Sequence, residues 1–305
     1  MFKHLLVPLD GSEPAEAALP AASYLAGALG ASITLLHLIE RDAPAEIHGH
    51  RHLRGAAEAQ TYLAEIARRL PAGAPVSTHV HEAQIDNVAA GIAAHIRELA
   101  PDLIVMCEHG GAGLRGFLYG SMAQQALALG TIPVLLLRPG RSQPAFALRR
   151  LLVALDGTPE HEAGLEPAAA LARACGAELH LLLVVPTVDT LPGNRSAAGR
   201  LLPGAMTQAL ELEREECEAY LREQTARLAA DGLSVRAEIR RGDPASVIAK
   251  GAHAAGVDLI VLATHGKAGM DALWAGSTAA RVVSRTKIPI LLVPVRTSSQ
   301  TASFT

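Results

Sequence analysis

Two glycine-bearing stretches in the second half of the chain carry residue types that suit phosphate. One spans 263–269 and contains Gly266 and Lys267, and the other is Gly276-Ser277 at the start of an expected helix. Glycines let backbone N–H groups approach an anion closely, and the free N–H groups of a helix start favour negative charge. Lys267 adds a mobile cation and Ser277 adds a hydroxyl. These stretches therefore predict a phosphate site.

An Asp-Gly pair followed by a hydroxyl residue occurs twice, as Asp10-Gly11-Ser12 and as Asp156-Gly157-Thr158. Each triplet comes directly after an apolar run. The carboxylate of Asp156 could accept hydrogen bonds from a base or a ribose. The same triplet is also an ordinary helix N-cap, in which a short polar side chain accepts a backbone N–H. Both interpretations stay open, and duplication at matching strand ends favours a binding site.

The motifs recur because the chain contains two copies of one pattern. Leu5–Ser12 matches Leu151–Thr158, and Asp102–Val105 matches Asp258–Val261. Leu151 follows Leu5 by 146 residues, whereas Asp258 follows Asp102 by 156, so the second copy holds about ten extra residues in its middle. We expect domain 1 at 1–139, a linker at 140–147, domain 2 at 148–296 and a polar tail at 297–305.

Short apolar runs alternate with Ala-rich stretches of helical periodicity in each copy. Helices are expected at 13–29, 58–70, 88–99, 121–129 and, long and charged, at 208–230. Strands are expected at 3–9, 32–39, 76–81, 102–107 and 132–137, and again at 150–155, 177–185, 233–240, 257–263 and 288–293. This alternation predicts an α/β fold of two tandem, doubly wound, parallel five-stranded sheets with helices on both faces, which is Rossmann-like. Ligands of such sheets bind beyond the carboxyl ends of the strands, where the suspected motifs lie.

Composition excludes several classes of function. A net charge of −3 without a basic run argues against nucleic acid, and no apolar run reaches the roughly 20 residues of a membrane span. Three scattered cysteines fit a reducing cytoplasm, and the N-terminus does not resemble a signal peptide.

The histidines at 48, 50 and 52 are expected in a solvated loop, and His79 and His81 are expected to face outward. No metal site is predicted.

The second glycine-bearing region is similar to the signature of ATP-binding universal stress proteins. That signature is Gly-x-x-Gly, nine residues, then Gly-Ser or Gly-Thr. Here it is Ala263-x-x-Gly266, nine residues, then Gly276-Ser277, with Ala263 as the departure. The flanking strands and the stretch 241–244, Arg-Gly-Asp-Pro, agree as well. The resemblance covers nearly the whole chain twice and indicates the tandem two-domain type, with an adenine-nucleotide α-hydrolase-like fold.

The resemblance implies which residues would hold ATP, with Mg²⁺ as its companion. Asp156 and the backbone of Val184 would face the adenosine end, and Ala263 would lie near the ribose. The phosphates would be cradled by Gly266, Lys267, Gly269, Gly276, Ser277 and Thr278. The counterparts in the first copy are Asp10, Leu38, Gly110, Gly113, Gly120 and Ser121.

The first copy departs from the signature in its charge. Glu108 replaces Thr264, and Gly111 replaces Lys267, so a carboxylate is gained and a cation is lost. A like charge a few ångströms from a triphosphate costs on the order of several kcal/mol before screening. We therefore expect the first copy to bind ATP weakly or not at all.

The leading hypothesis is a cytoplasmic stress-response or regulatory protein that signals through ATP-dependent packing or partner binding. It is expected not to be an enzyme beyond slow hydrolysis, because no nucleophile, general base or pair of metal-binding carboxylates is evident. One alternative is a ligand-free interaction module with vestigial sites. Another is an adenylate-forming enzyme, although its usual Ser-Gly-Gly-x-Asp-Ser loop is missing. Expected partners are a protein, a second copy of the chain, or the other half through the runs at 132–137 and 288–293.

Overall fold

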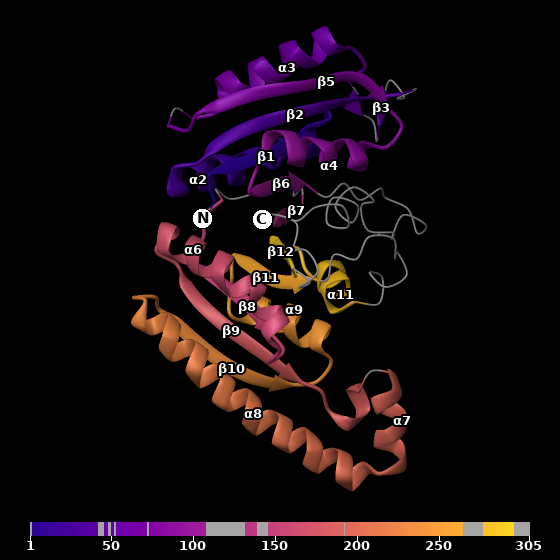
Figure 1. Cartoon of the computed structure of the whole chain (residues 1–305), viewed down its shortest axis with the longest axis vertical. Helices are drawn as coiled ribbons and strands as arrows, with labels where there is room; N and C mark the ends of the chain where they lie inside the picture. The colour runs from indigo at the N-terminus through magenta and orange to yellow at the C-terminus, as the bar shows by residue number, and fades with distance from the viewer. Residues whose placement is uncertain are drawn as a thin grey trace, which may run out of the picture. The chain divides into compact units, whose positions relative to one another are not determined.

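The computed structural model describes residues 2–41, 46–47, 50–51, 53–71, 73–107, 132–138, 146–191, 193–264 and 277–295. The chain forms two compact units, the first ending at Ala147 and the second beginning at Leu148. Each unit is built on a parallel sheet with helices packed against it (Figure 1).

The first unit holds a five-stranded parallel sheet in the order β5-β2-β1-β6-β7. Its strands are β1 (His4–Pro8), β2 (Ser32–Glu40), β5 (Val76–Ile85), β6 (Leu103–Cys107) and β7 (Val134–Leu137). Two short strands, β3 (Glu46–Ile47) and β4 (His50–Arg51), form a separate antiparallel pair. His50 therefore lies in a strand of this pair, and His48 and His52 fall outside the described residues.

The second unit repeats this sheet in the order β10-β9-β8-β11-β12. Its strands are β8 (Arg150–Leu155), β9 (Glu178–Val185), β10 (Val235–Arg241), β11 (Leu259–Thr264) and β12 (Ile290–Pro294). The predicted tandem of two parallel five-stranded sheets is confirmed. In both units the strand order reverses beside the first strand, which is the arrangement of a doubly wound fold.

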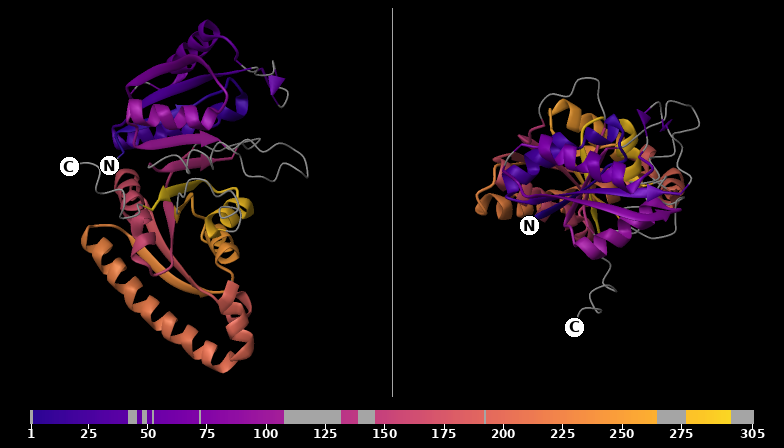
Figure 2. Two further views of the ribbon diagram at one scale, coloured as in Figure 1. Left: turned by 45° about the vertical axis from the view of Figure 1, so that its right-hand side comes forward. Right: turned by 90° about the horizontal axis from the view of Figure 1, so that it is seen from above.

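Helices cover both faces of each sheet, as right-handed crossovers require (Figure 2). In the first unit they are α1 (Glu13–Glu16), α2 (Leu19–Leu29), α3 (Ala56–Arg69) and α4 (Val88–Leu99). The second unit has α6 (Leu165–Cys175), α7 (Gly193–Leu201), α8 (Pro203–Ala230), α9 (Pro244–Ala254) and α11 (Thr278–Arg285), with the 3-10 turns η1 (Pro159–Gly164) and η2 (Val188–Thr190). Helices α6 and α8 pack on one face of this sheet, and α9 and α11 pack together on the other.

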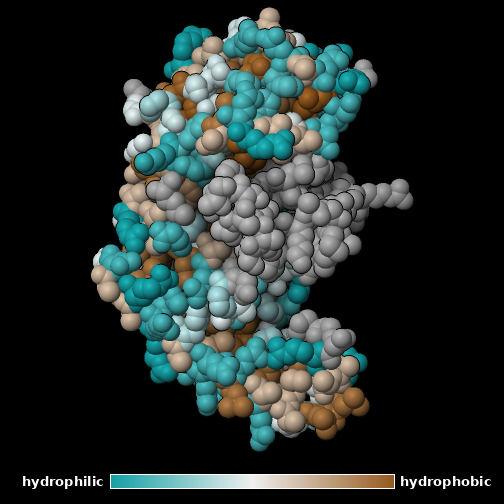
Figure 3. Space-filling view, viewed as in Figure 1, coloured by the Kyte–Doolittle hydropathy of each residue, from teal (hydrophilic) through white to brown (hydrophobic). Residues whose placement is uncertain are grey.

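Two helix predictions need correction. The helix expected at 13–29 is broken into α1 and α2, because Pro20 has no N–H to donate to the carbonyl of Glu16. The expected helix at 208–230 begins earlier, at Pro203, which takes the favoured first helical turn. With α7 before it, α8 accommodates the extra residues of the second copy. Leu201, Leu202 and Leu212 are exposed there, at the end of the second unit where Figure 3 shows brown surface.

The cores are aliphatic, as an aromatic content of only 3% requires. The central strands are continuous buried runs. Every residue of β6 is buried, and in β11 every residue is buried except Ala263, which is half-buried. Each fully buried leucine or isoleucine contributes about 1.5–3 kcal/mol relative to an exposed one. Among the described residues, no helix combines the length and the apolar character that crossing a membrane requires.

Candidate functional site

The candidate site lies where β8 and β11 part at the carboxyl edge of the second sheet. The pairing of β8 with β11 ends at Ala154 and Leu262, and the pairing of β8 with β9 ends at Leu155 and Leu183. The chain then leaves β8 at Asp156, and it leaves β11 two residues beyond Leu262, at Thr264. A doubly wound sheet opens a crevice at this split because the following connections go to opposite faces.

Asp156 is held at the split by a small hydrogen-bond network. Its Oδ1 accepts the backbone N–H of Thr158 at 3.0 Å and the Thr158 hydroxyl at 2.7 Å, and its Oδ2 contacts Nδ1 of His161. Gly157 between them has a φ of +82°, which favours glycine. Burial works to raise the pKa of Asp156, but the hydrogen bonds from His161 and Thr158 outweigh it and hold the pKa below its ordinary value. The carboxylate side chain is still 47% exposed, so a ligand can reach it.

The Thr158-His161-Asp156 group is not arranged as a catalytic triad. The Thr158 hydroxyl lies 3.0 Å from Nδ1 of His161, which is the same nitrogen that contacts Asp156. A triad histidine uses one ring nitrogen for the nucleophile and the other for the carboxylate. The group therefore orders the turn after β8 and does not build a proton relay.

The turn after β8 is fastened to α8. A Cβ on Gly157 would lie 3.6 Å from Sγ of the buried Cys217, and Glu162 of η1 accepts a hydrogen bond from Gln224 at 3.4 Å. Gln224 is itself buried and accepts from Arg227 at 2.7 Å. Helix α8 thus forms one wall beside Asp156, which the sequence did not reveal because these contacts span about sixty residues.

Val184 and Ala263 lie at the same edge. Val184 is buried in β9 one residue beyond Leu183, the last β9 residue paired with β8, and its register partner is Arg240 of β10. Ala263 is half-buried and pairs with Val293. A Cβ on Gly164 would come within 3.8 Å of the Ala263 backbone nitrogen, so this glycine lets η1 pack close to β11.

Ser277 and Thr278 begin α11. The hydroxyl of Ser277 accepts the N–H of Ala280 at 3.2 Å, which makes Ser277 the N-cap. Because α11 leads into the amino end of β12, its own N-terminus lies toward the carboxyl edge of the sheet. The other predicted phosphate residues, Gly266, Lys267, Gly269 and Gly276, lie outside the described residues.

The Gly-Asp-Pro element at 242–244 has a structural role in the second unit. Gly242 has a φ of +136°, and Asp243 caps α9 by accepting the N–H of Ser246 at 3.0 Å. Asp243 also contacts the guanidinium of Arg281 in α11. Burial works to raise the pKa of Asp243, but the bonds from Arg281 and Ser246 hold it below its ordinary value. The element therefore ties α9 to α11, the helix that Ser277 caps.

At the corresponding turn of the first unit, a leucine packs against the glycine that follows Asp10. Asp10 accepts the N–H of Ser12 at 2.9 Å, and Ser12 caps α1, so the capping interpretation holds for this triplet. Gly11 has a φ of +90°, and a Cβ there would meet Cγ of the buried Leu53 at 2.7 Å. Leu38 lies in β2 opposite His81. Gly110, Gly113, Gly120 and Ser121 lie outside the described residues.

The cysteines near these edges are buried. Cys107 ends β6 at 4% exposure, and burial raises the pKa of its thiol to about 12. Burial and then the carboxylates of Glu213, Glu216 and Asp156 raise the pKa of Cys217 to about 11. Since the thiolate is the reactive species, both side chains act as small apolar residues at neutral pH.

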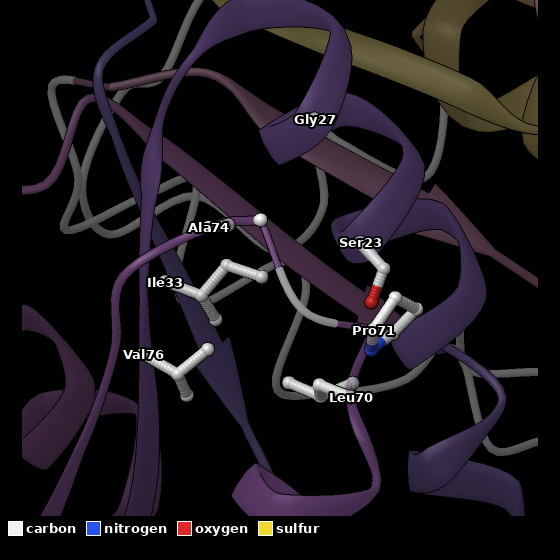
Figure 4. Close-up of a pocket in the computed structure, with 8 residues that line it drawn as sticks. Ser23, Gly27, Ile33, Leu70, Pro71, Ala74 and Val76 are labelled. Atoms are coloured by element: carbon white, nitrogen blue, oxygen red, sulfur yellow. The ribbon is translucent and has the colours of Figure 1, made fainter.

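A small pocket lies at the other end of the first sheet (Figure 4). Its walls come from the start of β2, the start of β5 and the ends of α2 and α3, and include Ser23, Ile33, Leu70 and Val76. Its volume of about 100 Å³ is below the roughly 300 Å³ of the smallest usual ligand sites. Because it opens at the amino ends of the strands, it is separate from the candidate site.

Comparisons with known proteins agree on one family. A model described as the universal stress protein family matches residues 1–138 and again 147–294. A universal stress protein of Methanocaldococcus jannaschii is 28% identical over 145 residues, which is 48% of this chain and 81% of that protein.

Solved structures match over almost the full chain. A universal stress protein from Archaeoglobus fulgidus aligns with a TM-score of 0.67 and 19% identity, covering 96% of both chains. A putative universal stress protein from Pseudomonas aeruginosa aligns with a TM-score of 0.66 and 20% identity, covering 96% of this chain and 93% of that one. At these identities the structural matches establish the fold.

Proposed function

Since this chain belongs to the universal stress protein family, we propose that its second unit binds an adenine nucleotide, ATP being the expected ligand, at the carboxyl edge of β8 and β11. The observation that carries the proposal is the placement of Asp156. Its carboxylate is held by Thr158 and His161 at the split between the two strands, yet half of the side chain remains exposed. A carboxylate has about four acceptor sites, so capacity remains for ribose or base donors.

The proposed ligand runs from Asp156 toward α11. The adenosine end would face Asp156 and the backbone of Val184, and the ribose would lie near Ala263. The phosphates would meet the N-terminus of α11 at Ser277 and Thr278, together with Gly266, Lys267, Gly269 and Gly276. Free N–H groups at a helix start favour an anion, which supports this direction.

Mg²⁺ would accompany the nucleotide through its phosphates. Among the described residues, the three metal-ligating side chains that come together belong to the first unit. Mg²⁺ commonly keeps several waters and binds through substrate phosphates, so a protein cage is not required.

The protein is proposed to act in stress response by regulated binding and not by fast catalysis. Occupancy of the second unit would bias a contact with a protein partner, a second copy of the chain or the other unit. The first unit, with Leu53 against Gly11, would serve as an interaction module without nucleotide. The three cysteines form no disulfide, which fits a cytoplasmic location.

The first test is to identify what the purified protein carries. Protein prepared without added nucleotide is denatured, and the released small molecules are separated by chromatography. We expect ATP at about one molecule per chain. Two per chain would contradict the proposal for the first unit. None, with no binding of ATP and Mg²⁺ by calorimetry, would overturn the proposed function.

A matched pair of variants at Ser277 locates the phosphates. Both Ser277→Asp and Ser277→Asn retain a capping side chain for α11, so both should fold. Only aspartate adds a negative charge beside the proposed phosphates, and we expect it to weaken ATP binding by at least about tenfold relative to asparagine. Lys267→Ala should weaken ATP binding as well. Equal affinity of the two Ser277 variants would place the nucleotide elsewhere.

A further inference from the structure

A cluster of histidines joins β5 to α4 in the first unit. His79 and His81 are two residues apart in β5 and therefore share a face of the sheet. The rings of both pack edge-on against His95 of α4, with centroids 4.8 and 4.9 Å away. The expectation that His79 and His81 face outward is therefore wrong, because α4 covers that face and both side chains are half-buried.

Three metal-ligating atoms converge in this cluster. Nε2 of His79 lies 3.1 Å from Nε2 of His95, and Oε2 of Glu98 lies 3.7 Å from the same His95 nitrogen. Glu98 is three residues after His95, so both project from one face of α4. All three atoms lie within 4.8 Å of one another.

The hydrogen bond of His95 determines which of its nitrogens is available. Nδ1 of His95 lies 2.8 Å from the carbonyl oxygen of Gly91, which can only accept. Nδ1 therefore carries the proton, and in the neutral ring Nε2 presents a lone pair toward His79. A ring held by a backbone carbonyl through one nitrogen, with the other free to ligate, is how metal-bound histidines are usually oriented. His95 is only 2% exposed, so this orientation is constrained by packing.

The distances suit a small tetrahedral cation. Two nitrogens bound at about 2.0–2.1 Å to one tetrahedral Zn²⁺ lie about 3.3 Å apart, close to the observed 3.1 Å. The three ligand atoms lie up to 4.8 Å apart, so the Glu98 oxygen has to move toward His79 by up to about 1.5 Å, and its side chain is 60% exposed and can rotate to do so.

We propose that His79, His95 and Glu98 bind a first-row transition-metal dication, for which Zn²⁺ is the probe, and that the ion clips α4 to the edge strand β5. Two imidazoles and a carboxylate suit zinc, whereas Mg²⁺ and Ca²⁺ prefer oxygen ligands alone. His81 stands beside the cluster as a fourth side chain able to ligate. The proposal does not depend on nucleotide binding.

The second unit shows that the fold does not require this cluster. Val76 and Val235 begin equivalent strands, which places Glu238 and Arg240 at the positions of His79 and His81. The position of His95 is Gly251, and that of Glu98 is Ala254. A Cβ on Gly251 would lie 3.3 Å from the guanidinium of Arg240, so an arginine fills this space in the second unit.

The test is titration of the full chain, freed of metal by a chelator, with Zn²⁺ followed by calorimetry. We expect one site that His79→Ala and Glu98→Gln each weaken by at least about tenfold, since even groups that only hydrogen-bond to a metal ligand contribute about 10- to 100-fold to metal affinity. The control replaces the histidines at positions 48, 50 and 52 together, as His48→Ala, His50→Ala and His52→Ala, and should leave this site intact. A second control, His161→Ala, removes the histidine that contacts Asp156 in the second unit and should also leave the Zn²⁺ site intact.

The alternative is that the His79 and His95 rings only hydrogen-bond to each other and bind no metal. Absence of Zn²⁺ binding, binding that survives His79→Ala, or binding lost in the triple variant at positions 48, 50 and 52 would each overturn the proposal. His79 and Glu98 are not fully buried, so their variants should keep the unfolding midpoint of the metal-free protein. Co²⁺ provides a second measurement, because its visible absorption reports tetrahedral coordination and should be lost in His79→Ala.

Discussion

Replacing Gly11 by alanine is expected to destabilise the first unit by about 2–4 kcal/mol. Two effects add. A φ of +90° is strained for any residue with a Cβ, and the new Cβ would lie 2.7 Å from Cγ of Leu53. Leu53 cannot move away easily because it is 5% exposed and packs with Ile39 and Ala59. The loss should appear as faster hydrogen exchange in peptides covering β1 and β2.

The second unit offers the matched control for Gly11. Gly157→Ala meets the same strain, with a φ of +82°, but its nearest neighbour is Sγ of Cys217 at an ordinary 3.6 Å. We expect Gly157→Ala to lower the free energy of unfolding by the backbone strain alone, about 1–2 kcal/mol. In a Leu53→Ala background, Gly11→Ala should likewise fall to this smaller cost. If Gly11→Ala lowers the free energy of unfolding equally in the native and Leu53→Ala backgrounds, contact with Leu53 is not the reason that position 11 requires glycine.

Asp243→Ala is expected to destabilise the second unit by about 1.5–3 kcal/mol. The substitution removes the N-cap of α9 and leaves the guanidinium of Arg281 without its carboxylate. Asp243→Asn keeps the cap and loses only the charge pair, so it should cost less. Asn87 occupies the equivalent position in the first unit and caps α4 at 2.9 Å. Asn87→Ala therefore removes an N-cap without a charge pair, and it should lower the free energy of unfolding by about 1 kcal/mol.

The Asp243 pair also makes a prediction about pH. The folded-state pKa of Asp243 lies below its ordinary value, so the charge pair stabilises the protein at pH values above the ordinary carboxyl pKa. This contribution is lost as the pH falls through the folded pKa. The difference in unfolding free energy between the native protein and Asp243→Asn should shrink over that acidic range. A difference that stays constant there would contradict the role assigned to Arg281.

The sequence predicted the fold well because buried parallel strands are continuous apolar runs. The duplicated pattern also predicted the strand ends where Asp10 and Asp156 lie. The break between α1 and α2 was readable from Pro20 and was missed because apolar periodicity continues across it. The phosphate cradle at 266–269 and Gly276 stays a prediction.

Contacts between distant segments were beyond reach of the sequence. Leu53 meets Gly11 from a loop about forty residues away, and Arg281 meets Asp243 across two helices. The convergence of His79 and His95 depends on where α4 crosses the sheet, which no periodicity specifies. Gln224 is similar, because a polar residue on a charged helix predicts exposure, whereas the structure buries it beside Glu162.

The burial of one cysteine in each unit has a practical consequence. Cys107 lies in the first sheet and Cys217 on the buried face of α8 in the second unit, whereas Cys175 at the end of α6 is half-exposed. A thiol reagent should modify Cys175 first, and the other two only when their surroundings open. Because the two buried thiols lie in different peptides, mass spectrometry of the modified chain would follow the opening of each half separately. The native protein thus carries its own pair of probes for comparing the stability of its two copies.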